Sequence, residues 1–341
     1  MPRFGILTSG GDCPGLNAVI RSAHIRVDRE YGGTLVGFRN GWRGVLDDDA
    51  VEITEEITHG IAGMGGTILG TSRTNPAEGT GALGRVRRTL EDNALDGLIA
   101  VGGEGSLSAA HALRGAGVKV VGVPKTIDND LNGTDYSFGF DTAVQIATDA
   151  MDRLLTTGAS HARCMIAEVM GRNSGWIALH AGIATGAHAV LIPEHPVSVD
   201  QIVEWVESAR NRGQAPLVVV AEGFPLEGDG IFHPRGTEAS GRPRLGGIGE
   251  RLAPLLEKRT GIETRATTLG HIQRGGTPTA YDRVLGARFG AAAVDAAVAG
   301  EWGKMVALSG ERIVTADLSE AIGSIKRISA ERYDRAAVCF G

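Results

Sequence analysis

Asp128 and Asp130 are the side chains whose type and spacing most directly suggest chemistry. They lie in the run Pro124-Lys125-Thr126-Ile127-Asp128-Asn129-Asp130, directly after the apolar segment 118–123. One carboxylate of such a pair can accept a proton as a general base while the other binds a metal ion. For an isolated run of this kind an Asx-rich turn is the alternative, because Asp and Asn close turns through their own side chains.

Two glycine-rich turns follow other apolar segments. The turn Ser9-Gly10-Gly11-Asp12 ends the segment 3–8, and the turn Gly102-Gly103-Glu104-Gly105-Ser106 ends the segment 96–101. Glycine lets the backbone approach an anion closely, and the N–H groups that begin the following helix favour phosphate. The first turn has neither the lysine of a P-loop nor the spacing of a dinucleotide-binding fingerprint, so it also fits a tight α/β turn.

Glu104 and Asp130 are the candidate ligands of a Mg²⁺ ion. Mg²⁺ prefers hard oxygen ligands and usually keeps several waters, so one or two carboxylates together with substrate phosphates are sufficient. Taken alone, Glu104 fits equally well a carboxylate that interacts with the positive end of a helix.

These side chains require elements that bring them to one edge of a sheet. Strand-like segments are expected near residues 3–8, 34–38, 96–101, 118–123, 164–169, 189–193, 217–222 and 263–269, with helix-length stretches between most of them. The alternation predicts an α/β fold with parallel sheets, in which ligands bind at the carboxyl ends of the strands. Residues 223–244, rich in Gly, Pro, Glu and Arg, are expected to form a long exposed loop.

Composition and charge fit a cytoplasmic protein of two lobes. The chain has 341 residues, of which 42% are hydrophobic and 22% charged, enough for two cores. The net charge of −6 and the lack of a basic run with interleaved aromatics argue against binding to nucleic acid. No apolar run is long enough to cross a membrane. Cys13, Cys164 and Cys339 lack the spacing of a zinc site or a disulfide framework.

Six motifs, in family order, resemble those of the ATP-dependent 6-phosphofructokinases of the phosphofructokinase A family, and in particular its mixed, actinobacterial-type branch. They are the segments 7–12, 66–73, 102–106, 124–130, 168–172 and 264–276, and the resemblance runs from Gly5 to about Asp282. It implies two Rossmann-like lobes with mainly parallel sheets, helices on both faces and an active site in the crevice between them. Residues 1–138 plus about 276–325 would form a nucleotide lobe, 139–275 a fructose 6-phosphate lobe and 326–341 a C-terminal tail.

The resemblance implies a glycolytic phosphotransferase. It would move the γ-phosphoryl group of ATP to the 1-hydroxyl of D-fructose 6-phosphate and give fructose 1,6-bisphosphate and ADP. Asp128 would accept the hydroxyl proton and Thr126 would orient the phosphoryl group, while Arg172 would stabilise the charge of the transition state together with Mg²⁺. The residues implied to bind ATP are Gly10, Gly11, Arg73, Gly103, Glu104, Gly105 and Ser106.

The sugar phosphate is expected to meet residues from two subunits of a homo-oligomer, usually a tetramer, with a dimer also possible. Those implied from one subunit are Thr126, Ile127, Asp128, Met170, Gly171, Arg172, Glu222, His271, Ile272, Gln273 and Arg274. Arg163 and Arg265 would reach in from the neighbouring subunit. The planar guanidinium groups suit phosphate oxygens.

Two positions point to different phosphoryl donors. In this family the position of Gly105 is glycine in ATP users and typically aspartate in pyrophosphate users, whereas a lysine at the position of Lys125 is typical of pyrophosphate users. An aspartate at position 105 would crowd and repel an ATP phosphate, so Gly105 favours ATP, and a reversible pyrophosphate-dependent enzyme is the alternative.

Two further function classes fit the sequence less well. A dinucleotide-dependent oxidoreductase needs an acidic residue at the end of the second strand, where Phe38-Arg39 stands. A non-catalytic sugar-phosphate sensor would have lost the base or a metal ligand, yet Asp128, Asp130 and Glu104 are all present. Catalysis is therefore the simpler interpretation.

Overall fold

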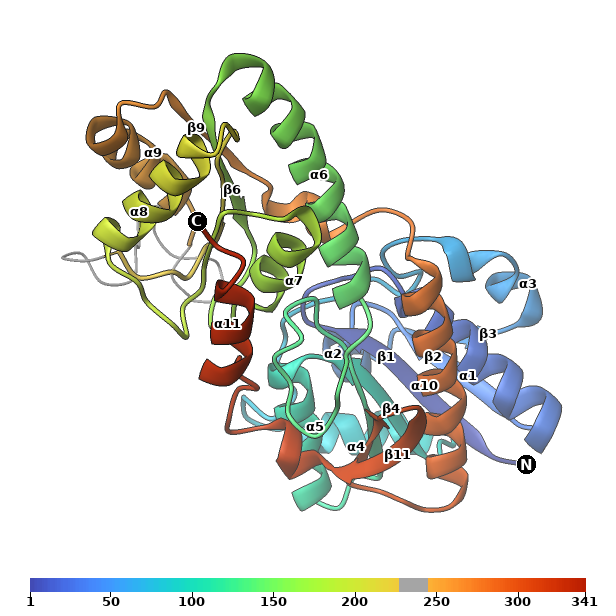
Figure 1. The fold of residues 1–341 in the computed structure, drawn as a ribbon. Helices are drawn as coiled ribbons and strands as arrows, with labels where there is room; N and C mark the ends of the chain where they lie inside the picture. Colours follow the sequence, from blue (N-terminus) through green and yellow to red (C-terminus); the bar gives the residue numbers. More distant parts are fainter. Residues whose placement is uncertain (227–244) are drawn as a thin grey trace. The chain divides into compact units, whose positions relative to one another are not determined.

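The computed structural model describes residues 1–226 and 245–341, which form two compact units (Figure 1). Unit 1 consists of Met1–Thr142 and Arg274–Ile325, and unit 2 of Ala143–Gln273 and Lys326–Gly341. The expected lobe boundaries lie close to these, and which lobe takes which substrate stays a prediction. Beyond Leu226, the loop expected over 223–244 lies outside the described residues.

Unit 1 is built on a mixed sheet, which in the described residues has the strand order β11-β10-β5-β4-β1-β2-β3. The inner strands are parallel, and the edge strands β3 and β11 run antiparallel to their neighbours. The strands are β1 (Arg3–Ser9), β2 (Thr34–Phe38), β3 (Ala50–Ile53), β4 (Gly97–Gly102), β5 (Val120–Pro124), β10 (Lys304–Ser309) and β11 (Arg312–Asp317). Neither edge strand was expected from the sequence, nor was β10.

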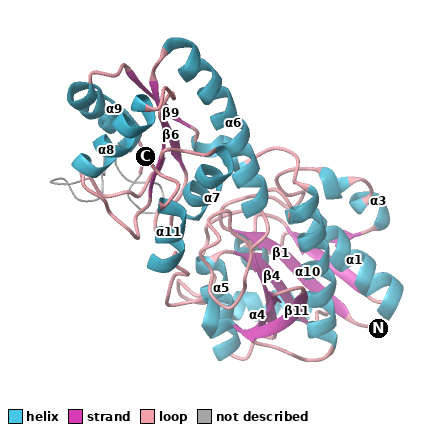
Figure 2. Ribbon diagram, viewed as in Figure 1, coloured by secondary structure: helices cyan, strands magenta, loops and turns pink. Residues whose placement is uncertain are grey.

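Helices flank this sheet (Figure 2). They are α1 (Leu16–Tyr31), α2 (Trp42–Asp47), α3 (Glu55–Thr58), α4 (Ala82–Asp92), α5 (Glu104–Gly115) and α10 (Ala280–Val298), with the 3₁₀ turns η1 (Ile61–Gly63) and η3 (Leu318–Ala321). Alternate strand residues such as Leu7, Leu98 and Ala100 form one core cluster with side chains of α2, α4 and α5. Helices α1 and α10 pack against each other. Because helices cover both faces of the sheet, the inner strands appear in the sequence as continuous apolar runs.

Unit 2 contains, in the described residues, a parallel sheet of order β7-β8-β6-β9. Its strands are β6 (Cys164–Val169), β7 (Ala189–Leu191), β8 (Leu217–Ala221) and β9 (Thr264–Thr268). Its helices are α6 (Phe140–His161), α7 (Trp176–Thr185), α8 (Val199–Asn211), α9 (Ile248–Thr260) and α11 (Ala330–Ala337), with the 3₁₀ turn η2 (Gly270–Arg274). Helix α11 lies in the segment expected as a tail, and it packs against α7. No helix in the described part of the chain is long and apolar enough to span a bilayer.

Asp282 joins the first turn of α10 to the first turn of α6, whose residues up to Thr142 belong to unit 1. It is fully buried in α10, and its Oδ2 accepts hydrogen bonds from the backbone N–H of Thr142 at 2.8 Å and from the Thr142 hydroxyl at 2.5 Å. Burial raises the pKa of the Asp282 carboxyl from 3.8 to about 6. The protonated form is therefore favoured by the fold, and ionisation of Asp282 destabilises the native state.

This shift predicts a pH-dependent stability. A raised folded-state pKa contributes stability that is fully present below pH 3.8 and lost as the pH rises through about 6. Asp282→Asn keeps an acceptor for Thr142 without the charge, so we expect it to gain roughly 3 kcal/mol of unfolding free energy relative to wild type between pH 4 and pH 7. Urea unfolding across this range measures the difference, with exposed Asp92→Asn as the control. A difference that stays constant with pH would exclude this role.

Candidate functional site

Three loops of unit 1 begin at the same edge of its sheet. Ser9 of β1 pairs with Gly102 of β4, and Gly102 pairs with Pro124 of β5, so these parallel strands end together. The backbone N–H of Lys125 also donates to the Gly102 carbonyl at 3.0 Å. The structure thus brings both glycine-rich turns and the run from Lys125 to Asp130 to one edge, as the sequence predicts.

A fourth segment is tied to the first glycine-rich turn. The N–H of Gly10 donates to the carbonyl of Ser72 at 2.9 Å, and the Thr71 hydroxyl donates to the carbonyl of Gly10 at 2.7 Å. The Ser9 hydroxyl donates to the same Ser72 carbonyl at 3.1 Å. These bonds place Arg73, the next residue, beside the turn.

Two cationic side chains contact the carbonyl groups of this turn. Lys125 is only 3% exposed and donates from Nζ to the carbonyl of Gly11, and burial lowers its pKa. Arg274 donates from Nη1 to the carbonyl of Asp12 at 3.3 Å. With the N-terminus of α5 at the same edge, this arrangement suits a phosphate-bearing ligand.

The run after β5 is an ordered turn. The N–H of Asp128 donates to the Thr126 hydroxyl at 3.1 Å, the Ser137 hydroxyl donates to the Thr126 carbonyl at 2.8 Å, and the Ser137 N–H donates to Asn129 Oδ1 at 3.2 Å. Asn129 has a left-handed backbone with φ of 49°. The Ile127 side chain is fully buried, so a ligand at this residue would meet its backbone.

The two expected metal ligands lie in separate loops of this edge. Glu104 is exposed in the first turn of α5, where its Oε1 accepts a hydrogen bond from the Ser108 hydroxyl at 3.3 Å, and Asp130 ends the run after β5. Across residues 1–226 and 245–341, no group of three or more His, Cys, Asp or Glu side chains is placed to hold a metal ion. Carboxylate oxygens are ligands of the kind that Mg²⁺ prefers, and the sharing of one ion by these two side chains stays a prediction.

In unit 2, the loop after β6 carries Met170, Gly171 and Arg172. Gly223 supports this loop on one side, since its N–H donates to the Gly171 carbonyl at 3.1 Å and a Cβ at position 223 would lie 1.9 Å from the Arg172 carbonyl oxygen. Only glycine permits that approach. Sequence reasoning missed Gly223, although it directly follows the strand-end acid Glu222.

Gln273 supports the same loop from η2. It is fully buried, its Oε1 accepts the Met170 N–H at 3.3 Å, and its Nε2 donates to the Gly270 carbonyl at 3.0 Å. The geometry favours a positioning role for this side chain. His271 and Ile272 are exposed on the same turn, and Ile272 is 59% exposed.

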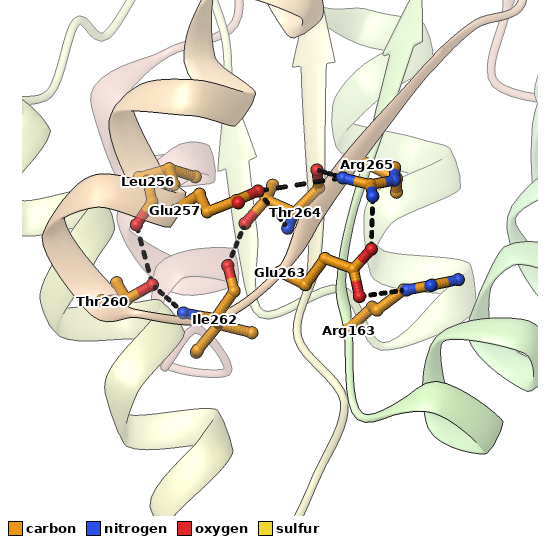
Figure 3. A network of polar contacts seen from close by, with 8 residues as sticks. All are labelled: Arg163, Leu256, Glu257, Thr260, Ile262, Glu263, Thr264 and Arg265. Carbon is orange, nitrogen blue, oxygen red and sulfur yellow. Dashed lines mark hydrogen bonds and ion pairs between the residues drawn. The ribbon is translucent and has the colours of Figure 1, made fainter.

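Arg163 and Arg265 are held side by side by Glu263 (Figure 3). Arg163 Nε lies 2.8 Å from one carboxylate oxygen of Glu263, and Arg265 Nη2 pairs with the other. The pKa of Glu263 is lowered chiefly by Arg163. Glu257, which accepts the Thr264 N–H at 3.1 Å, lies 3.8 Å from Arg265. Glu263 thus holds the two predicted phosphate-binding arginines beside each other within this chain.

Comparisons with known proteins match this chain to one family, and the similar proteins are named for two different phosphoryl donors, pyrophosphate and ATP. The sequence matches the phosphofructokinase family over residues 3–297. It is 54% identical to the pyrophosphate–fructose 6-phosphate 1-phosphotransferase of Amycolatopsis methanolica, over 99% of this chain and 100% of that protein. It is 50% identical to ATP-dependent 6-phosphofructokinase 3 of Streptomyces coelicolor, over 98% of each chain. The solved phosphofructokinase of Saccharomyces cerevisiae aligns with a TM-score of 0.83 and 32% identity, over 94% of this chain and 44% of that longer one.

Proposed function

This chain belongs to the phosphofructokinase family, and we propose that it transfers the γ-phosphoryl group of ATP to the 1-hydroxyl of fructose 6-phosphate. The products would be fructose 1,6-bisphosphate and ADP. A glycolytic role of this kind would place the enzyme in the cytoplasm.

The open space around Gly105 is the observation that supports ATP as the phosphoryl donor. Gly105 is exposed in the first turn of α5, and no heavy atom lies within 4 Å of the position that a Cβ would take. Lys125 does not extend into this space, because its ammonium group is buried against the Gly11 carbonyl. The pyrophosphate-dependent reaction is the second candidate, supported by the presence of Lys125 and by relatives with that activity.

In the proposed reaction, the oxygen of the sugar 1-hydroxyl forms a bond to the γ-phosphorus of ATP while Asp128 accepts the hydroxyl proton. The bond between the γ-phosphorus and the β,γ-bridging oxygen breaks in the same step, and ADP leaves. Thr126 orients the phosphoryl group by hydrogen bonding. Arg73, Arg172 and the N–H groups at the start of α5 neutralise phosphate oxygens. Glu104 and Asp130 would hold a Mg²⁺ ion, which would supply further charge neutralisation on the phosphates.

Unit 2 supplies the proposed sugar-phosphate contacts. Met170, Gly171, Arg172, Glu222 and His271 would act from the same subunit. Arg163 and Arg265 would act on the site of a neighbouring subunit, and their pairing through Glu263, which leaves Arg265 exposed, supports a role on a partner. We therefore propose a homotetramer or a homodimer with shared sites.

The direct test supplies purified protein with fructose 6-phosphate, Mg²⁺ and either ATP or pyrophosphate, and follows fructose 1,6-bisphosphate. Turnover with ATP alone is expected. Turnover with pyrophosphate alone would show that Lys125 indicates the donor, and activity with neither would favour a sugar-phosphate sensor.

Gly105→Asp is expected to lower kcat/KM for ATP by about 10- to 100-fold, since a carboxylate at this position would repel the donor phosphates. The fold should tolerate it, because the position is open and an acid in the first helical turn is favourable. Steady-state kinetics with varied ATP measures the effect. Gly115→Asp, at the other end of α5 and also in open space, is the matched control. Equal kcat/KM in the two variants would contradict the assignment.

A further inference from the structure

Glu194 links two segments of unit 2 that are far apart in the sequence. Its Oε1 and Oε2 accept the backbone N–H of Gly175, at 3.1 and 3.0 Å. Its Oε1 also accepts the N–H of Ile328 at 3.3 Å. A single carboxylate thus joins the start of α7 to the C-terminal part of the chain, and hydrogen bonds to an ionised acceptor are the stronger kind.

Gly175 lies at the end of the loop that begins with Met170. It directly precedes α7, and a Cβ at this position would lie 2.2 Å from Ile192 Cγ2. Gly175, which ends this loop, is therefore packed against Ile192 in the chain that follows β7. Gly223 and Gln273 contact the other end of the same loop.

The segment Lys326–Gly341, here called the C-terminal clasp, is anchored along this part of unit 2. The indole N–H of Trp176 donates to the Lys326 carbonyl at 2.8 Å, and Arg332 lies over the Trp176 ring at 4.8 Å. Tyr333 is buried, stacks on His195 at 5.0 Å and donates its hydroxyl to the Val190 carbonyl at 2.8 Å. The clasp lies wholly beyond residue 297, where the family match ends.

We propose that Glu194 is a positioning residue which, with the C-terminal clasp, fixes the loop Met170–Gly175 in the conformation that binds the sugar phosphate. The proposal rests on the proposed function, in which Met170 and Arg172 meet fructose 6-phosphate. The backbone N–H of Gly175 donates to the Glu194 carboxylate, and the N–H of Ile328 in the clasp donates to the same carboxylate. The Trp176 indole adds a second link to the clasp through the Lys326 carbonyl. The side chains of Met170 and Arg172 are held by the backbone that Glu194 orders.

Glu194→Gln tests this link, since glutamine keeps the size but loses the charge and presents an NH₂ group to a backbone donor. We expect the KM for fructose 6-phosphate to rise by about three- to tenfold, with kcat and the KM for the phosphoryl donor within about twofold of wild type. Amide hydrogen exchange of residues 171–179 should also become faster. Glu331→Gln is the matched control, because Glu331 pairs with exposed Arg335 on the same clasp, and this variant should change neither quantity.

Tyr333→Phe loosens the clasp without touching Glu194, and it is expected to speed exchange over residues 171–179 as well. The exchange measurement needs no substrate, so it separates this inference from the proposed function. Unchanged exchange in both variants overturns the positioning role even if wild type is inactive. Faster exchange with an unchanged KM for fructose 6-phosphate, in an active enzyme, overturns the link to the substrate.

Discussion

Replacing Asp128 by asparagine is expected to lower kcat by about 10²–10⁴-fold, the usual contribution of a general base. Asparagine has nearly the same size and keeps a side-chain oxygen, but it cannot take the proton of the sugar hydroxyl. The turn itself is held by bonds of Thr126, Asn129 and Ser137, so the variant should fold. Steady-state kinetics at saturating substrates gives the turnover number.

Asp130→Asn is the matched variant for this test. It removes the same charge two residues away, where a metal ligand is proposed. We expect its activity to recover as Mg²⁺ is raised, whereas Asp128→Asn stays slow at every Mg²⁺ concentration. A wild-type turnover number in Asp128→Asn would remove Asp128 from the chemistry.

Several strands that the sequence predicts correctly are buried on both faces, such as β4 and β8, whereas the correctly expected β9 is mostly not buried. Continuous apolar runs mark β4 and β8 because no side of them meets water. Two of the missed strands, β3 and β11, lie at the sheet edges and pair antiparallel with their neighbours, while the third, β10, is an inner and largely buried strand. Half-exposed strands such as Ala50–Ile53 are stabilised by cross-strand partners that a local pattern does not show.

Some features of the candidate site could be predicted from the sequence, and others depend on contacts that form only on folding. The register of β1, β4 and β5 places the loops that carry Gly10, Gly103 and Asp128 at one sheet edge, where parallel strands end, and the binding of a ligand by these residues stays a prediction. The direction of Lys125 was not predictable, since it depends on the approach of Gly11 from a distant loop. Glu194 gives no local signal either, because its partners Gly175 and Ile328 become neighbours only after folding.

Gln273 illustrates the limit of carrying a motif onto a sequence. The motif predicted a ligand contact, and whether the residue makes one stays a prediction. Its amide is already used to hold Met170 and Gly270. A residue within a binding motif can therefore act on the ligand through the backbone that it positions.

Glu168→Ala is expected to lower the free energy of unfolding by about 2–6 kcal/mol, since two buried N–H donors would lose their acceptor at roughly 1–3 kcal/mol each. Glu168 is 1% exposed at the end of β6. Its carboxylate accepts the N–H of Gly247 at 2.8 and 3.1 Å and that of Gly249 at 2.9 Å. These donors begin α9, where a negative charge is favourable. Alanine would leave both donors buried and unpaired beside a new cavity.

Urea unfolding followed by circular dichroism measures this loss. Glu168→Gln should fall between wild type and alanine, because its oxygen still accepts one N–H while its NH₂ group faces the other. Glu204→Ala, an exposed acid on α8, should stay within about 0.5 kcal/mol of wild type. Since Met170 follows β6 by one residue, any folded Glu168→Ala should also bind fructose 6-phosphate more weakly. A stability equal to that of Glu204→Ala would show that the three hydrogen bonds of Glu168 contribute no net stability.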